Sequence, residues 1–164
     1  MSIKVLNRKL LISLMLFAAA GPLYAAAPCN NSNRKVVTLQ DISFGIAGSF
    51  AVGGTVDVSP TGFRAATGDV VLLGGTWSAA IFQIQGCAND LVTISLPVAA
   101  QALRAGGGGK IDVMNFVTQP THTTPYILDA TGAMQFRAGA SLILRPFHPA
   151  GVYTGQVAID ILYN

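Results

Sequence analysis

The last fourteen residues, Gly151 to Asn164, constrain the fold more than any other part of this chain. Four apolar side chains alternate there with four others, and the apolar set is Val157, Ile159, Ile161 and Tyr163. Alternation with β-branched and aromatic residues is typical of a half-buried strand. Gly155 argues against a helix, because glycine costs about 1 kcal/mol at a helical position. We therefore expect one long strand, docked on a core to which each apolar side chain contributes roughly 1.5–3 kcal/mol.

Short segments of strand character recur along the rest of the chain, with turn signals about every eight to twelve residues. The expected strands cover residues 35–44, 55–58, 70–73, 80–85, 91–96, 111–116, 126–129, 133–137, 140–144 and 151–164. Residues 98–104 have helical leanings, but a short strand fits them as well. This pattern predicts an all-β fold, an Ig-like antiparallel β-sandwich with about eight or more short strands.

Three details of that pattern carry local expectations. The alternation slips by one residue between Leu39 and Ile42, which predicts a β-bulge. The glycines of residues 45–54 predict a turn region. The continuous apolar run of residues 70–73 predicts a strand that is buried on both faces.

Residues 1–27 have the layout of a secretory signal peptide. A basic start precedes an apolar run, residues 10–20, that is too short to span a bilayer. Cleavage after Ala25 or after Ala27 fits, and Pro28 favours the former. Residues 28–164 are then expected to form a single β-sandwich domain that is exported and does not span a membrane after cleavage.

The charge balance excludes one class of partner. The formal net charge of +3 comes wholly from Lys4, Arg8 and Lys9 of the leader, and the remainder carries seven bases and seven Asp residues. Nucleic-acid binding needs a basic face, so we expect none. The chain contains no Glu, which also argues against long exposed helices.

Both cysteines, Cys29 and Cys87, lie after the leader. Export and an even number of cysteines favour a disulfide between them, with two unpaired thiols as the alternative. Closing a loop of this length would stabilise the fold by roughly 4 kcal/mol in the chain-entropy model.

No motif indicates catalysis, a cofactor or a metal. The run Gly106 to Lys110 resembles a phosphate loop, but Arg104 replaces its first glycine and Ile111 its Ser or Thr, so a hairpin loop is expected. His122 and His148 lie in separate loops without metal-ligand spacing. We expect a non-enzymatic protein.

Five motifs together resemble a bacterial family catalogued as domain of unknown function 4402. They are Asp-Ile-Ser-Phe-Gly (41–45), Gly-Gly-Thr-Val-Asp-Val-Ser-Pro-Thr-Gly (53–62), Thr-Gly-Asp-Val (67–70), Gly-Ala-Ser-Leu (139–142) and Gly-Val-Tyr-Thr-Gly (151–155). This resemblance spans most of the chain after the leader, and it implies no activity.

The carboxyl-terminal segment is also similar to that of chaperone–usher pilins and spore-coat-U-like subunits, which end in an alternating strand with a penultimate aromatic residue. The resemblance implies a pilin-like sandwich that a periplasmic chaperone, an usher or a like subunit completes by strand addition. The implied recognition residues are Gly151, Tyr153, Val157, Ile159, Ile161 and Tyr163. Few residues precede Cys29 after cleavage, whereas pilins carry a donor segment there, and this argues against shaft polymerisation by that route.

The leading hypothesis is an exported structural or fimbria-like subunit in the periplasm, on the cell surface or in a fimbrium of a Gram-negative bacterium. In the alternative, the final segment is an ordinary core strand of a self-complete, adhesin-like module. Its loops Ala105 to Lys110 and Thr118 to Pro125 would then contact a surface glycan or a protein. An exported hydrolase is a third and weaker reading.

Overall fold

The computed structural model describes residues 34–164, and every regular element in that range is a β-strand. The strands are β1 (Lys35–Gln40), β2 (Ser43–Val58), β3 (Arg64–Ser78), β4 (Ala80–Gln85), β5 (Leu91–Ser95), β6 (Ala99–Arg104), β7 (Lys110–Gln119), β8 (Tyr126–Ile127), β9 (Ala133–Leu144), β10 (Tyr153–Gly155) and β11 (Asp160–Tyr163). All strand pairs are antiparallel, so the expected all-β sandwich is confirmed.

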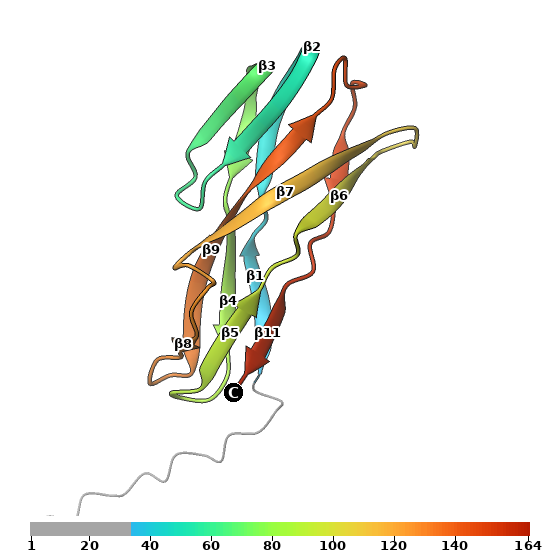
Figure 1. Cartoon of the computed structure of the whole chain (residues 1–164). Coiled ribbons are helices and arrows are strands. Elements are labelled where there is room, and N and C mark those ends of the chain that lie inside the picture. The colour runs from blue at the N-terminus through green and yellow to red at the C-terminus, as the bar shows by residue number, and fades with distance from the viewer. Residues whose placement is uncertain (1–33) are drawn as a thin grey trace, which may run out of the picture.

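Two sheets of unequal size make up the molecule (Figure 1). The large sheet has eight strands in the order β1-β4-β9-β7-β6-β10, and β2 joins it by pairing with β9 and with β3. The small sheet has the order β11-β5-β8. It covers only the lower half of the large sheet in the view of Figure 1.

The lower half of the sandwich holds the first core. The predicted alternation of β4 and β5 is confirmed there, because Ile84 of β4 and Val92 and Ile94 of β5 are buried in one cluster with Phe136 of β9. Leu128, just after β8, completes the buried set. The two sheets are thus held together by apolar side chains that face each other across the sandwich.

The upper half holds a second core under a folded ribbon. β2 and β3 form one long hairpin that bends over near Gly53, where the ladder between them is interrupted (Figure 1). Gly53 has a positive φ of 74°, and a Cβ there would lie 2.4 Å from the Leu144 carbonyl oxygen, so only glycine fits the bend. Val56, Ile111 and Leu144 are the buried members of this core.

Strand β9 connects the two halves without a break. Gly139 was expected to separate two strands, but it lies inside β9. A Cβ on Gly139 would lie 2.2 Å from the carbonyl oxygen of Val58, so the glycine permits a close approach of β2 and does not end the strand.

The carboxyl-terminal segment differs from expectation in one respect. It forms two strands, β10 on β6 in the large sheet and β11 on β5 in the small one, and not a single strand across one sheet. Pro97 lies in the link between β5 and β6, where the missing N–H cannot continue a ladder. The predicted alternation itself is confirmed, since Val157, Ile159 and Ile161 are half-buried and their neighbours are exposed.

Other local expectations had mixed outcomes. The expected bulge has a counterpart in the register shift between Thr38 and Gln40 of β1. The expected strand of residues 35–44 is wrong as a single strand, because β1 ends at Gln40 and β2 begins at Ser43. Residues 45–54 do not form a separate turn region but belong to β2, whose pairing with β3 is interrupted between Ser49 and Gly54, where the ribbon bends. Residues 70–73 are not buried on both faces, and Leu73 is 63% exposed, because no second sheet covers the outer face of β3. Residues 98–104 form strand β6 and no helix.

Some expectations lie outside the described residues, namely the signal peptide and Cys29. No helix within residues 34–164 has the length and apolar character needed to cross a membrane. Cys87, just beyond β4, is not a free thiol. Its pairing with Cys29 stays a prediction.

Candidate functional site

The feature that stands out is a pair of unpaired sheet edges on one side of the first core. Within the described range, β1 pairs only with β4, and β11 pairs only with β5. β1 is the last strand of the large sheet, and β11 is the last strand of the small one. We call the space between these two edges the seam.

On the large sheet, exposure rises step by step toward the seam. Phe136 of β9, Phe82 of β4 and Thr38 of β1 are aligned across three strands and therefore share the inner face. Phe136 is 1% exposed, Phe82 is half-buried and Thr38 is exposed. The next row repeats the trend, since Ile84 is fully buried and Val36 beside it is 39% exposed. The inner face of β1 is therefore not covered by the small sheet.

The small sheet shows the same trend toward β11. Ile161 is aligned with Ile94, and Tyr163 is aligned with Val92. The β5 residues are buried, whereas their β11 partners are only half-buried although they pack on the same core. Both inner faces thus become accessible at the seam, which leaves apolar surface without a covering strand.

Residues 156–159, between β10 and β11, extend the seam upward. Val157 and Ile159 are half-buried, like Ile161 and Tyr163, and so continue the alternation of β11. The backbone of these four residues makes no hydrogen bond to any other residue of the described range. Such unpaired backbone groups beside a partly exposed apolar row are a template for an added strand.

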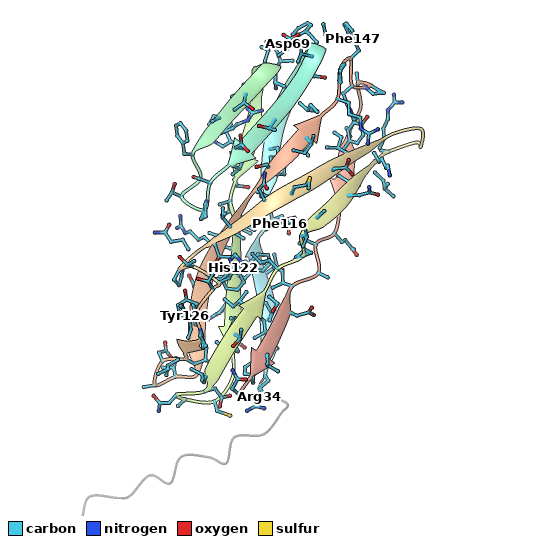
Figure 2. All side chains as sticks on the ribbon, in the orientation of Figure 1. Arg34, Asp69, Phe116, His122, Tyr126 and Phe147 are labelled. Atoms are coloured by element: carbon cyan, nitrogen blue, oxygen red, sulfur yellow. The ribbon has the colours of Figure 1, made fainter. Side chains whose placement is uncertain are left out.

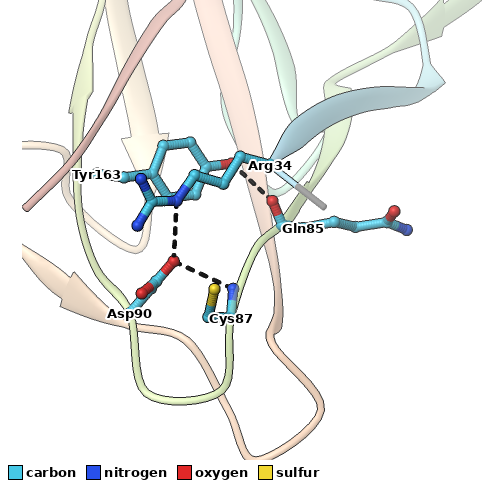
Figure 3. A network of polar contacts seen from close by, with 5 residues as sticks. All are labelled: Arg34, Gln85, Cys87, Asp90 and Tyr163. Carbon is cyan, nitrogen blue, oxygen red and sulfur yellow. Dashed lines mark hydrogen bonds and ion pairs between the residues drawn. The ribbon is translucent and has the colours of Figure 1, made fainter. Parts of the chain in front are cut away.

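A polar cluster closes the lower end of the seam (Figure 3). The Tyr163 hydroxyl donates a hydrogen bond to the Gln85 carbonyl oxygen at 2.6 Å and so joins the two sheets. The Arg34 guanidinium lies 4.9 Å from the centre of the Tyr163 ring, and its Nε is 3.3 Å from Oδ2 of Asp90. The same carboxylate accepts the Cys87 backbone N–H at 3.1 Å. We call Arg34, Gln85, Asp90 and Tyr163 the clasp.

Burial and packing fix the Tyr163 ring within the clasp. Desolvation by burial raises the pKa of the Tyr163 hydroxyl above its usual value, and the nearby Arg34 charge opposes that shift only in part. A Cβ on Gly86 would lie 2.8 Å from Cε1 of Tyr163, so the ring occupies the space that a side chain would need. Figure 2 places Arg34 at the lower end of the molecule.

The clasp also fixes the relative direction of the two edges. Tyr163 ends β11 and reaches Gln85, and Gln85 is aligned with Lys35, the first residue of β1. β11 therefore ends where β1 begins, and the two edges run in opposite directions. A strand inserted between them would be antiparallel to one edge and parallel to the other.

The structure brings together part of the residue set expected to recognise a partner. Val157, Ile159, Ile161 and Tyr163 lie along the seam. Tyr153 instead packs on the second core, and its hydroxyl donates to the Pro149 carbonyl oxygen at 2.8 Å. A Cβ on Gly151 would contact the Arg104 side chain, again away from the seam.

Sequence reasoning missed the β1 side of the seam and the clasp. The pairing of β1 with β4 across forty residues has no local signal, so Val36 could not be placed at an edge. Asp90 precedes β5 in a turn, where an acidic residue is common. Only its position between Arg34 and Cys87 makes it part of the clasp.

The two loops of the alternative reading lie far apart. Residues 105–109 close a tight hairpin, in which the Arg104 N–H donates to the Gly109 carbonyl oxygen at 2.9 Å, as expected in place of a phosphate loop. Figure 1 shows this hairpin and the β7–β8 loop on opposite sides of the molecule. The latter borders a shallow hollow of about 330 Å³ that is lined by Gln119, Gln135, Phe136 and Arg137.

Within the described part of the chain, no group of three or more His, Cys, Asp or Glu residues is arranged to hold a metal ion. A family model described as "Domain of unknown function (DUF4402)" matches residues 35–163. Neither a curated protein nor a solved structure matches the chain.

Proposed function

This chain belongs to the DUF4402 family, and from that premise we propose that it is an exported, non-enzymatic structural subunit that accepts a β-strand at the seam. The observation that carries the proposal is the stepwise exposure of both inner faces toward β1 and β11. The strand would come from a periplasmic chaperone or from a neighbouring subunit of a surface or fimbria-like assembly.

The physical basis is main-chain pairing combined with burial of alternate side chains. The unpaired edges of β1 and β11 offer hydrogen-bonding groups on both sides of an inserted strand. Val36 and Phe82 on one side, and Ile159 and Ile161 on the other, offer apolar surface for its inward residues. Because the clasp closes the lower end, the strand enters from the upper end, beside residues 156–159.

An appended strand tests this proposal directly. A flexible linker and a seven-residue strand are added after Asn164 of the mature chain, with Val at the three inward positions. We expect higher secreted yield and a higher unfolding temperature, because the added strand covers both edges. The matched control carries Asp at the same three positions and should give no gain. If the Val and Asp versions behave alike, the seam does not accept a strand.

A pair of adjacent substitutions tests the same proposal without an added segment. Ile159→Asp puts a charge on the seam, whereas Ala158→Asp puts the same charge on the exposed side one residue away. We expect the first to abolish secreted yield or chaperone capture and the second to leave both unchanged. Equal yields would contradict the proposal.

The adhesin-like alternative rests on a different observation, the hollow beside the β7–β8 loop. Its lining by Gln119, Gln135 and Arg137 offers planar donors and acceptors that suit the hydroxyl groups of a saccharide. A glycan array with the mature chain tests it. Binding that Gln135→Ala removes would favour this function, and a flat array would exclude it.

A further inference from the structure

Three polar side chains meet at the hollow beside the β7–β8 loop, on the face of β9 that points away from the core. Gln135 and Arg137 are two residues apart on β9 and therefore share this face, because Phe136 between them points into the first core. Gln119, at the end of β7, is aligned with Arg137. Such neighbours are roughly 5–7 Å apart, so one small ligand can contact all three side chains.

These three side chains have no partner among the residues that the structure describes. The ion pairs of residues 34–164 use Arg34 and Arg145, and no carboxylate there pairs with Arg137. The side-chain amides of Gln119 and Gln135 make no hydrogen bond to another described residue. Phe136 is only 1% exposed, so the accessible lining of the hollow is polar. The hollow thus presents a guanidinium flanked by neutral donors and acceptors.

The loop that borders the hollow is held in place by its own hydrogen bonds. The Tyr126 hydroxyl donates to the Thr121 carbonyl oxygen. Oγ1 of Thr118 lies 3.3 Å from Nδ1 of His122, within hydrogen-bond distance. Gln119 is therefore part of a wall that is already ordered, and an ordered site loses less freedom when it binds a ligand.

From these observations we infer that the hollow binds a saccharide that carries a carboxylate, such as a uronic acid unit of a polysaccharide. The planar fork of the Arg137 guanidinium matches a carboxylate. The amides of Gln119 and Gln135 can donate to ring hydroxyl groups and accept from them. The volume of about 330 Å³ is at the lower end of the range for small-ligand sites, which suits a single sugar unit.

The inference rests on the adhesin-like function proposed above and does not depend on strand addition at the seam. The hollow lies on the outer face of the large sheet, at β9 and the end of β7. The seam instead opens between the inner faces of the two sheets, at β1 and β11. A ligand in the hollow therefore leaves the seam accessible.

The charge of the hollow favours an acidic sugar over other ligands. Arg137 is the one charged residue in its lining, so a single negative charge finds a cation there. An acidic peptide or a nucleic acid carries consecutive negative charges, which one guanidinium cannot neutralise. A neutral sugar would leave the guanidinium without a charged partner, and an apolar ligand would leave all three side chains without hydrogen bonds.

Two probes that differ in a single substituent test the inference on the mature chain. Methyl β-glucuronide carries a carboxylate where methyl β-glucoside carries a hydroxymethyl group, and the two molecules are otherwise the same. Binding is followed by NMR titration of the backbone amides. We expect the glucuronide to bind with a dissociation constant on the order of 1 mM, with shifts at residues 119 and 135–137. The glucoside should bind at least tenfold more weakly.

Substitutions at Arg137 show whether its guanidinium holds the carboxylate. Arg137→Gln should weaken glucuronide binding at least tenfold. Arg137→Lys should weaken it several-fold, because lysine keeps the charge but not the planar fork. Lys110→Gln is the matched control, because it removes the same charge at an exposed position beside the β6–β7 hairpin, on the opposite side of the molecule (Figure 1), and should change nothing. Circular dichroism confirms that each variant is folded.

The outcomes separate this inference from the function on which it rests. Equal affinity for the two probes would overturn the role of the carboxylate but leave the adhesin-like function standing, since a neutral saccharide would still bind. Glucuronide binding that Arg137→Gln does not weaken would overturn the assignment to the hollow. A triglutamate peptide that binds more tightly than the glucuronide would overturn the saccharide class. Binding of neither probe would overturn the inference, and the glycan array then decides the adhesin-like function by itself.

Discussion

Removing one oxygen atom from the clasp gives the most direct measure of how the carboxyl terminus is held. Tyr163→Phe keeps the ring, with its packing on Gly86, and deletes the hydroxyl that donates to Gln85 at 2.6 Å. A hydrogen bond of this kind contributes about 0.5–1.5 kcal/mol, and an acceptor left unpaired costs more only where water cannot reach it. Tyr163 is half-buried, so water can replace the hydroxyl.

We therefore expect Tyr163→Phe to lower the free energy of unfolding by about 1 kcal/mol at pH 7. For a domain of this size, that corresponds to a fall of roughly 3–5 °C in the unfolding temperature. The assay is urea unfolding of the oxidised mature chain, followed by tryptophan fluorescence from Trp77 and by circular dichroism. An unchanged urea midpoint with an unchanged m-value would mean that the bond does not join the sheets in solution.

Alkaline pH gives the same reasoning a second, independent check. Burial raises the pKa of Tyr163 in the folded state, so the folded chain keeps this proton at a pH where the unfolded chain has lost it. The resulting stability is fully present below the unfolded pKa, near 10, and is lost as the pH rises through the folded pKa. The stability difference between the parent chain and Tyr163→Phe should therefore shrink between pH 9 and pH 11. A difference that stays constant across that range would refute the assignment.

Two further predictions concern Gly139 of β9, where that strand closely approaches β2, and His148, between β9 and β10. Gly139→Ala should lower the free energy of unfolding by about 3 kcal/mol or more, because the new methyl group meets the backbone of Val58. Gly151→Ala is the control and should lower it by less than about 1 kcal/mol, because its methyl group meets only the flexible Arg104 side chain. Urea unfolding of both variants measures the difference. Burial lowers the pKa of His148, so its contribution to stability is present above about pH 6.5 and is lost as the pH falls through the folded pKa. His148→Gln should remove that part of the acid sensitivity between pH 7.5 and pH 5, and an unchanged pH profile of the urea midpoint would contradict this.

The sequence predicted side-chain parity well, because parity is a local property. Val92 and Ile94 of β5, and Ile159 and Ile161 near the terminus, face the core as their alternation requires. The break between β10 and β11 was not predictable from the same pattern. Alternation continues through residues 156–159, whereas the break follows from the pairing partners, because β10 pairs with β6 of the large sheet and β11 pairs with β5 of the small sheet.

Burial was the property that the sequence could not supply. The run Val70 to Leu73 has the composition of a doubly covered strand, yet a continuous apolar run does not say whether a second layer exists to cover it. Here the small sheet covers only the lower half, so the outer side of β3 stays accessible. For the same reason, the sequence could not show that Val36 of β1 lies at the seam, where it faces inward but is not covered by the small sheet.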